Sequence, residues 1–279
     1  MTLYDLEGTR VTYYPYMDAV EYGCDNTGTE GASDKIQEYI NNNKYCYFPK
    51  GTYNIDKIVY FPSERIIICE HGTAFKRTGD ISGMITSSGT SDITEYNGVH
   101  DVLIYGATFD GNGQNATCNC TMLSFCHAQR ITIEKCRFIN PTQSWHEIEM
   151  NSSKDCKIID CVFDGTDNTS ECLQIESPYS SSSWPFGNGA IDNTIPIYCE
   201  VYGCSFYNAT TAIGNHGSGV ANYIDIHDCV FDTLSSTVIT LSGQYNRVHD
   251  CTVVNCDGSF VPNTNTVKYN NYINGTFTS

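Results

Sequence analysis

The chain is poor in basic side chains. Its 279 residues include only 15 Lys and Arg against 32 Asp and Glu, which gives a formal net charge of -17. Nucleic-acid binding depends on neutralising phosphates with basic residues, so this balance argues against a nucleic-acid partner. An anionic membrane surface is disfavoured for the same reason. Uronic-acid polymers would also be repelled unless a cation screened the site, so a neutral glycan is the simplest partner.

Long apolar segments are also missing. No run of about 18 apolar residues occurs, so we expect no transmembrane helix and no membrane partner. The first ten residues (MTLYDLEGTR) lack a basic start followed by an apolar core. They therefore do not read as a signal peptide.

Cysteine, in contrast, is abundant. The 15 cysteines are odd in number, so at least one must be free. Cys118-Asn119-Cys120 has no partner pair at metal-ligand spacing, which disfavours zinc. We expect mostly buried free thiols, with some disulfides as the alternative. We expect no metal and no cofactor. A calcium ion is compatible with the sequence, but nothing in it implies one.

A repeat organises most of the chain. A β-rich run, a short turn and a second run ending in Cys-x-Phe recur as ITIEKCRF (131–138), CKIIDCVF (156–163), CEVYGCSF (199–206) and IDIHDCVF (224–231). The repeat length is about 22 to 25 residues, which is too short for a propeller blade and suits one coil of a parallel β-helix. The recurrent Cys and Phe should then form two buried ladders, with Asn, Asp, Gly and Ser at the turns.

The N-terminal region differs from the repeat. Residues 33–42 carry apolar side chains at helical spacing, at Ile36, Tyr39 and Ile40, with Ser33 as the expected N-cap. A helix here would cover the open end of the solenoid. We therefore predict an all-β, single-stranded parallel β-helix with an N-terminal capping helix. It should form one domain over 1–279, with cap and hairpin in 1–55 and coils in 56–279.

These features resemble the pectate-lyase-like superfamily of right-handed parallel β-helices. The motif that carries the resemblance is Tyr47-Phe48-Pro49-Lys50-Gly51-Thr52-Tyr53 after the helix, which reads as the family's hairpin. The chain is most similar to polygalacturonase-like glycoside hydrolases and phage tailspike domains. The turn Phe109-Asp110-Gly111-Asn112-Gly113 matches theirs, whereas Ser170-Glu171-Cys172 retains only the second acid of their Asp-Asp-Cys. The resemblance implies a polysaccharide partner and an extracellular or virion-associated location, as a monomer or a homotrimer.

Aligning the first strand of each coil predicts a candidate site. Leu123, Ile148, Leu173, Ile213 and Ile239 form one inward column, so their neighbours should point outward. The middle coils would then gather Glu147, Glu149, Gln174, Glu176 and His216 on one outer patch, with a hollow at Gly214. Such crowding of carboxylates raises their pKa values and is typical of a functional site, although a solvated polar face is the simpler alternative.

Aromatic residues lie next to this patch. Trp145 and His146 precede it, and an insertion after Glu176 carries Tyr179, Trp184 and Phe186. Exposed rings of this kind can stack on sugars, or they can pack back onto the coils. We expect these five residues and Gln174 to contact substrate.

Three functions fit this arrangement. The leading one is a glycoside hydrolase, which needs two carboxylates. The rivals are a non-catalytic glycan-binding adhesin or tailspike domain and, less favoured because the patch contains no Arg or Lys, a polysaccharide lyase. Strand geometry puts the Cα atoms of Glu149 and Glu176 roughly 8 Å apart, which favours inversion. We assign Glu176 as acid and Glu149 or Glu147 as base. His216 would orient a carboxylate or a sugar hydroxyl, and Glu171 is a reserve on family position.

Overall fold

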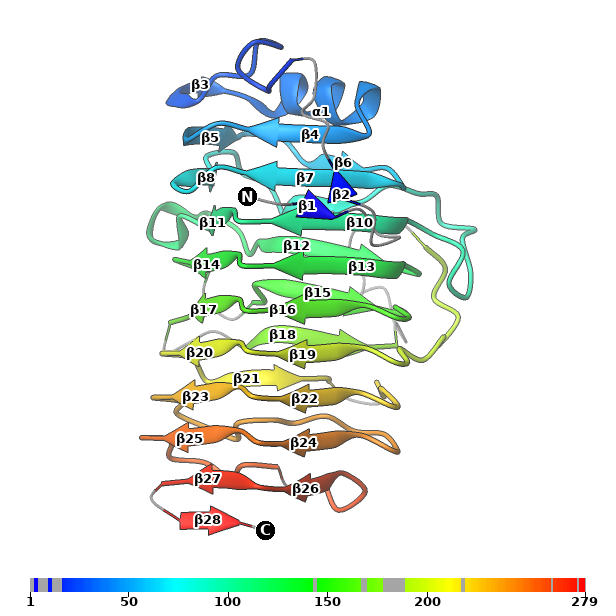
Figure 1. Ribbon diagram of the computed structural model, residues 1–279, viewed down its shortest axis with the longest axis vertical. Helices are drawn as coiled ribbons and strands as arrows, with labels where there is room; N and C mark the ends of the chain where they lie inside the picture. Colours follow the sequence, from blue (N-terminus) through cyan, green and yellow to red (C-terminus); the bar gives the residue numbers. More distant parts are fainter. Residues whose placement is uncertain are drawn as a thin grey trace.

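The chain winds into a solenoid of three parallel sheets that share one core (Figure 1). The computed structural model describes residues 3–4, 10–11, 17–142, 145–166, 170–177, 189–216, 219–261, 263–274 and 276–278. Successive coils add strands to a six-stranded, a nine-stranded and an eleven-stranded sheet, and the six-stranded sheet ends at β21 (Thr211–Gly214) while the other two continue. The last strand of the eleven-stranded sheet, β28 (Thr276–Thr278), pairs antiparallel with β27 (Asn271–Ile273). The expectation of an all-β parallel β-helix is confirmed.

The strands fall into these three sheets as follows. The six-stranded sheet contains β6 (Val59–Phe61), β9 (Gly83–Ser87), β12 (Thr121–Cys126), β15 (Ile148–Asn151), β18 (Glu171–Glu176) and β21 (Thr211–Gly214). The nine-stranded sheet contains β4 (Tyr45–Phe48), β7 (Arg65–Cys69), β10 (His100–Tyr105), β13 (Gln129–Glu134), β16 (Lys157–Ile159), β19 (Glu200–Tyr202), β22 (Asp225–His227), β24 (Arg247–His249) and β26 (Val267–Tyr269). The eleven-stranded sheet contains β3 (Thr27–Gly31), β5 (Gly51–Ile55), β8 (Thr73–Arg77), β11 (Thr108–Asp110), β14 (Arg137–Ile139), β17 (Val162–Asp164), β20 (Ser205–Tyr207), β23 (Val230–Asp232), β25 (Thr252–Val254), β27 (Asn271–Ile273) and β28 (Thr276–Thr278). A short pair, β1 (Leu3–Tyr4) and β2 (Arg10–Val11), and a 3-10 turn at Gly113–Asn115 complete the elements.

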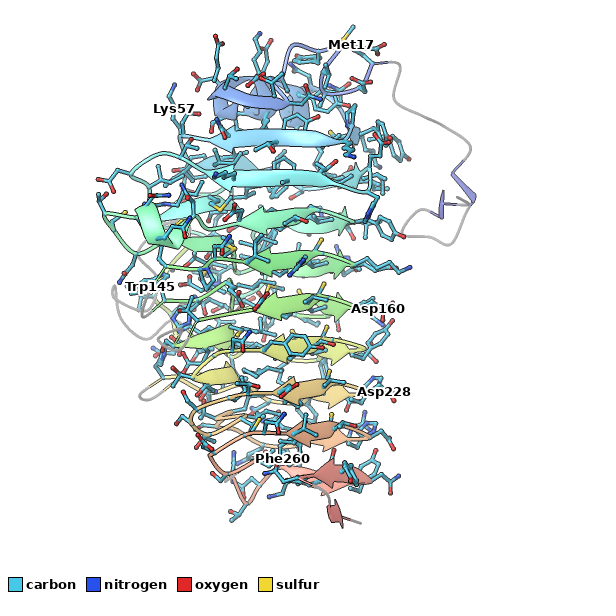
Figure 2. The ribbon with its side chains drawn as sticks, turned by 90° about the vertical axis from the view of Figure 1, so that its left-hand side faces the viewer. Met17, Lys57, Trp145, Asp160, Asp228 and Phe260 are labelled. Atoms are coloured by element: carbon cyan, nitrogen blue, oxygen red, sulfur yellow. The ribbon has the colours of Figure 1, made fainter. Side chains whose placement is uncertain are left out.

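The Cys-x-Phe repeat builds the corner between the nine-stranded and eleven-stranded sheets. Phe109, Phe138, Phe163, Phe206 and Phe231 stack with ring centroids 4.5–5.3 Å apart. Before each Cys stands one residue with positive φ, for example Asp160 at 51° and Asp228 at 52°. Asp, Asn and Gly tolerate this left-handed conformation, which is why they recur there. Figure 2 shows Asp160 and Asp228 along this side of the solenoid.

The cysteines are interior residues. All 15 are free, and all but Cys118 are buried. The ladder thiols donate weak hydrogen bonds to the carbonyl two residues earlier, as Cys161 does to Ile159 at 3.3 Å and Cys229 to His227 at 3.2 Å. The expectation of mostly buried free thiols is confirmed.

The helix α1 (Ser33–Asn42) covers the N-terminal end of the coils (Figure 1). Ile36, Tyr39 and Ile40 form its buried face, as predicted. The N-cap assignment was wrong: Ala32 occupies that position. Ser33 instead uses its hydroxyl to accept hydrogen bonds from the backbone N–H groups of Asp56 and Lys57, at 3.0 and 3.1 Å, so it ties the helix to the chain that follows β5.

The expected hairpin at residues 47–53 is a corner. β4 pairs in parallel with β7, and β5 pairs in parallel with β3 and β8, so the two strands belong to different sheets. Parallel pairing therefore already involves β3, β4 and β5, which precede residue 56. The motif resembles a hairpin in sequence because both structures need a Pro-x-Gly turn between two strands.

Candidate functional site

The predicted register of the six-stranded sheet is correct. Leu123 pairs with Ile148, Ile148 with Leu173 and Leu173 with Ile213, and an isolated bridge joins Ile213 to Ile239. The next position on each strand reads Ser124, Glu149, Gln174 and Gly214 in the same pairing. Strand pairing therefore aligns the polar residues of successive coils.

Glu149 is held by two hydroxyl groups. Thr121 donates to its Oε1 at 2.9 Å and Ser124 donates to its Oε2 at 2.9 Å, and the side chain is 1% exposed. Burial raises the pKa of Glu149 to about 7 against the opposing effect of these donors, and the charge of Glu176 raises it further. Glu149 is therefore a carboxyl group that titrates near neutrality.

Glu176 lies one coil further on. Its Oε2 accepts the backbone N–H of His216 at 2.7 Å, whereas its Oε1 has no partner among the described residues. Burial raises the pKa of Glu176 to about 7, opposed mainly by His216. A Cβ atom at Gly219 would lie 2.9 Å from Oε2, so the absence of a side chain lets that backbone close over the carboxyl group.

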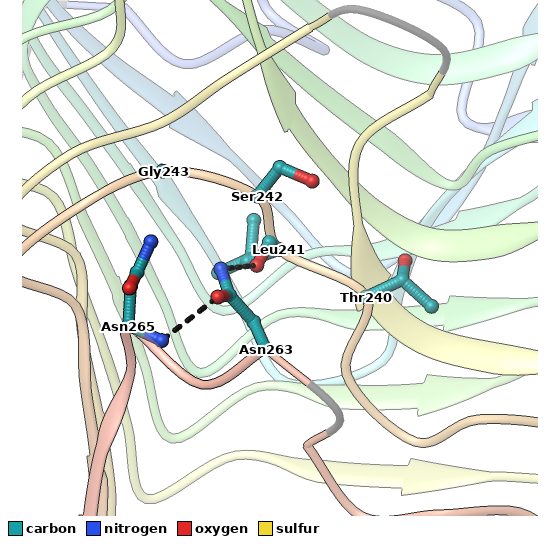
Figure 3. Close-up of a pocket in the computed structure, with 6 residues that line it drawn as sticks. All are labelled: Thr240, Leu241, Ser242, Gly243, Asn263 and Asn265. Atoms are coloured by element: carbon teal, nitrogen blue, oxygen red, sulfur yellow. Dashed lines mark hydrogen bonds between the residues drawn. The ribbon is translucent and has the colours of Figure 1, made fainter.

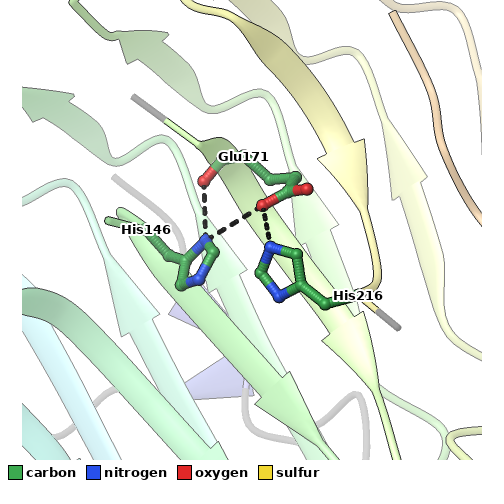
Figure 4. A group of neighbouring side chains, drawn as sticks. All are labelled: His146, Glu171 and His216. Atoms are coloured by element: carbon green, nitrogen blue, oxygen red, sulfur yellow. Dashed lines mark hydrogen bonds and ion pairs between the residues drawn. The ribbon is translucent and has the colours of Figure 1, made fainter. Parts of the chain in front are cut away.

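Beside these acids, His146, Glu171 and His216 form a compact cluster (Figure 4). Oε2 of Glu171 lies 2.7 Å from Nε2 of His216 and 3.4 Å from Nδ1 of His146. The hydroxyl of Ser170 donates to the same oxygen at 2.8 Å. Three residues from separate coils thus converge on one carboxylate oxygen.

The charges in this cluster are set by burial and by mutual contact. Burial lowers the pKa of His146 to about 4. Burial alone would raise the pKa of Glu171, but the contacts with His216 and His146 bring it below its ordinary value. The hydrogen bond to Glu171 raises the pKa of His216. At neutral pH the cluster therefore holds an ionised Glu171 beside a neutral His146.

Glu147 does not join the patch, which corrects that expectation. It stands just before β15, where the chain turns into the strand and side-chain alternation has not yet begun. Its backbone lies between Met122 and Cys172 of the adjacent coils, which belong to the hydrophobic core. Neither carboxyl oxygen has a hydrogen-bond partner among the described residues. Glu147 is a core residue, and the pairing pattern could not distinguish it from Glu149.

The hollow expected at Gly214 is filled. A Cβ atom there would lie 2.1 Å from Oγ1 of Thr240 and 2.9 Å from Cγ of Glu171, so neighbouring side chains occupy the space. Gln174, one strand away, uses its Nε2 to contact Nδ1 of His216 at 2.8 Å. The missing side chain at position 214 thus lets Glu171 and Thr240 pack closely.

An open hollow does occur one coil further along (Figure 3). It is lined by Thr240, Leu241, Ser242, Gly243, Asn263 and Asn265. The backbone N–H of Thr240 bonds to the carbonyl of Ile213, which fixes this hollow next to β21. Hydroxyl and amide groups without formal charge line it.

Of the expected aromatic contacts, the structure describes Trp145 alone. Trp145 is half-buried on the side of the solenoid (Figure 2), and its Nε1 donates to Oγ1 of Thr121 at 2.7 Å. The same hydroxyl bonds to Glu149, so the indole is linked to the acid. Tyr179, Trp184 and Phe186 lie outside the described residues.

Thr121 and Ser124 are members of the site that the sequence did not single out as functional. Ser124 stood in the aligned column one rung before Glu149, so its contact could have been read from the register. Thr121 lies three residues before Ser124, and the alternation of side chains along the strand does not predict that its hydroxyl contacts Glu149.

Comparison with known proteins supports the fold. No protein-family model and no curated protein sequence matches the chain. Among solved structures, the surface adhesin PfbA of Streptococcus pneumoniae matches with TM-score 0.72 at 14% identity, over 92% of this chain and 79% of that one. The fold is the right-handed parallel β-helix.

Proteins named for other functions share this fold. The family 28 exopolygalacturonase of Yersinia enterocolitica matches with TM-score 0.68 at 10% identity, over 94% of this chain and 57% of its own. Tailspike protein 3 of bacteriophage CBA120 matches with TM-score 0.57 at 12% identity, over 86% and 43%. The structures that share this fold thus include an exopolygalacturonase, a tailspike protein and an adhesin, so the fold does not select one activity.

Proposed function

We propose that the chain is a glycoside hydrolase that cleaves a polysaccharide on the outer face of its six-stranded sheet. The observation that carries this proposal is the placement of Glu149 and Glu176 on adjacent coils. Asn151 pairs with Glu176, so Glu149 is offset from Glu176 by one rung and two residues. Strand geometry then separates their Cα atoms by roughly 8 Å. Both side chains leave the same face of the sheet. Inverting hydrolases hold their two carboxyl groups about 6.5–9.5 Å apart, which leaves room for a water molecule, and this Cα spacing supports such a separation.

The roles follow from the surroundings of each acid. Glu176, enclosed by Gly219 and by the backbone of His216, is the general acid that protonates the leaving glycosidic oxygen. Glu149 is the general base: it takes a proton from water as that water attacks the anomeric carbon and the glycosidic bond breaks. Glu171, His146 and His216 position the substrate, and Glu171 remains the reserve for the base.

The substrate we propose is a neutral glycan. The chain has a net charge of -17, and an anionic polymer would meet the carboxyl groups of this face. Trp145 offers a ring for stacking, and the hollow at Ser242, Asn263 and Asn265 offers hydroxyl and amide groups for sugar hydroxyls. The described helix α1 is only ten residues long, so no helix in the described part of the chain could span a membrane.

A second candidate function is glycan binding without cleavage. It is favoured by the enclosure of the acids, since Glu149 and Glu176 are 1% and 0% exposed. An adhesin or a tailspike domain would need the same aromatic and amide groups and no matched acid pair. Either function is compatible with an extracellular or virion-associated protein, and light scattering would distinguish a monomer from a homotrimer.

A polysaccharide lyase is the least supported function. The ion pairs of Glu171 and Glu176 in the described residues involve histidine alone, with no Lys or Arg to serve as the base.

The test is incubation of the protein with a panel of neutral and uronic polysaccharides. New reducing ends from a neutral polymer are the expected result. Unsaturated products would indicate a lyase, and retention on a glycan without products would indicate a binding protein. Either outcome would refute the proposed hydrolysis.

A further inference from the structure

The cluster of His146, Glu171 and His216 has the composition of a metal site. One ligand atom from each residue lies within 4.8 Å of the other two. The residues stand on three successive coils: Glu171 begins β18, His146 lies two residues before β15 and His216 lies two residues after β21. His146 and Glu171 are buried, whereas the side chain of His216 is 37% exposed and leaves one side open to solvent.

Gln174 provides an independent observation. Its side chain is 2% exposed, and Oε1 has no hydrogen-bond partner among the described residues, while Nε2 faces Nδ1 of His216 at 2.8 Å. The oxygen and nitrogen of an amide are assigned from such contacts. Turning the amide over pairs Oε1 with an Nδ1–H of His216. Nε2 of His216 then faces the Glu171 carboxylate at 2.7 Å, a position filled either by a proton or by a metal ion that both groups ligate.

We propose that His146, Glu171 and His216 bind one divalent transition-metal ion, with Gln174 orienting His216 from behind. Two imidazoles and one carboxylate are donors that Zn²⁺ and neighbouring metals accept, and three protein ligands leave a coordination position open. Calcium is excluded from this site by donor type, because it takes six to eight oxygen ligands. A carbonyl oxygen accepting the second imidazole N–H is the usual support for a ligating histidine.

A metal ion at this site would also reduce the repulsion between the carboxylates of this face. The charge of Glu176 raises the pKa of Glu149, and the charge of Glu171 raises the pKa of Glu176, while His216 opposes both effects. A divalent ion beside Glu171 offsets that repulsion. The role of the metal ion rests on the proposed function, because a sugar hydroxyl would bind at the coordination position that the three protein ligands leave open.

The test measures ion binding without substrate. The protein is incubated with Co²⁺ or Zn²⁺, desalted and analysed for metal per chain. We expect one ion per chain and, with Co²⁺, the visible spectrum of a low-coordinate site without a thiolate charge-transfer band. Glu171→Gln and His216→Gln should abolish this binding, and Gln174→Leu should weaken it by about 10- to 100-fold.

Two control variants separate this site from other donors. His249→Gln removes a histidine from β24 of the nine-stranded sheet, and Cys118→Ser removes the one cysteine that is not buried. Both should bind one ion like the wild type. Less than one ion per chain, a thiolate band, or binding that survives in Glu171→Gln and His216→Gln would overturn the site. An inactive protein that binds one ion would refute the hydrolysis alone, and an active protein that binds none would refute the metal alone.

Discussion

At the residue scale, Cys161 and the cysteines stacked on it show how one side chain can both fill the core and donate a hydrogen bond to a backbone carbonyl group. A buried thiol is small and apolar, yet it donates to a carbonyl at the corner where the chain leaves the nine-stranded sheet. Parallel stacking keeps these thiols pointing the same way, so bonding two of them would disturb the ladder.

The first prediction concerns these thiols. Denaturing the protein without reductant and titrating with a thiol reagent should detect essentially all 15 cysteines, because all are free. Before denaturation, Cys118 should react first, since the remainder are buried. Detection of a single reactive thiol after denaturation would mean that the ladder is cross-linked.

The second prediction concerns Glu147. Its carboxyl group is fully buried without a partner among the described residues, so replacing it with methionine should stabilise the protein by about 1–3 kcal/mol. Burial raises the pKa of Glu147 well above its ordinary value. The folded state therefore holds the proton longer than the unfolded state, and stability falls as pH rises above about 4.5.

Urea unfolding of wild type and Glu147→Met between pH 5 and pH 8 checks this. The advantage of the variant should grow with pH. Glu64→Gln, at an exposed position of the N-terminal coils, is the control and should change stability little at any pH. A variant less stable than wild type would show that the carboxyl group stabilises the fold, through its contact with the thiol of Cys172.

At the element scale, the nine-stranded sheet carries a ladder of stacked rings on its outer face. Tyr202, His227, His249 and Tyr269 lie in one register, with ring centroids 4.5–5.1 Å apart. Each imidazole has a carboxylate at both nitrogens; for His227 these are Asp228 at 2.8 Å and Glu200 at 3.2 Å. For His227, the two carboxylate acceptors favour an imidazolium, which donates from both nitrogens.

The third prediction follows from this ladder. Burial alone would lower the pKa of His227, but Asp228 and Glu200 raise it above its ordinary value. Stability from this group is therefore complete below about pH 6.5 and is lost as pH rises through the folded-state pKa. His227→Gln should lower stability at pH 5.5 by up to about 1 kcal/mol, because the pairs are partly exposed, and by less at pH 9.

Thermal unfolding at the two pH values measures this difference. His71→Gln, at an exposed position, is the matched control and should lack the trend. A loss for His227→Gln that is equal at both pH values would assign the stabilisation to ring stacking instead of charge.

Element boundaries also show where sequence reasoning succeeds. The apolar spacing of Ile36, Tyr39 and Ile40 predicted α1, because one buried face follows directly from helical periodicity. The role of Ser33 could not be predicted in the same way, because its partners, Asp56 and Lys57, are 23 and 24 residues away. The local sequence pattern therefore predicts a helix, but it does not predict which distant backbone N–H groups form hydrogen bonds with the residues at its ends.

At the scale of the whole molecule, the repeat determines the architecture. Phe138, Phe163 and Phe206 pair on successive coils, even across the insertion between the last two. The spacing of the repeat therefore predicted both the fold and the register of the inward column. The candidate site was only partly predictable. Pairing aligned Glu149 with Gln174, but the turn geometry that buries Glu147 and the contact of His216 with Glu171 depend on how the chain bends between strands.

The most direct test of the central claim is turnover of the responsive polysaccharide by Glu176→Gln and Glu149→Gln. Each variant should lose about 10²- to 10⁴-fold in kcat, as expected when a general acid or base is removed, while glycan binding and the circular dichroism spectrum stay unchanged. Glu64→Gln should match the wild type. Early-time NMR should show a product of inverted anomeric configuration. Full activity in both variants would contradict the account by showing that the chemistry lies elsewhere, and a retained configuration would exclude the inverting mechanism.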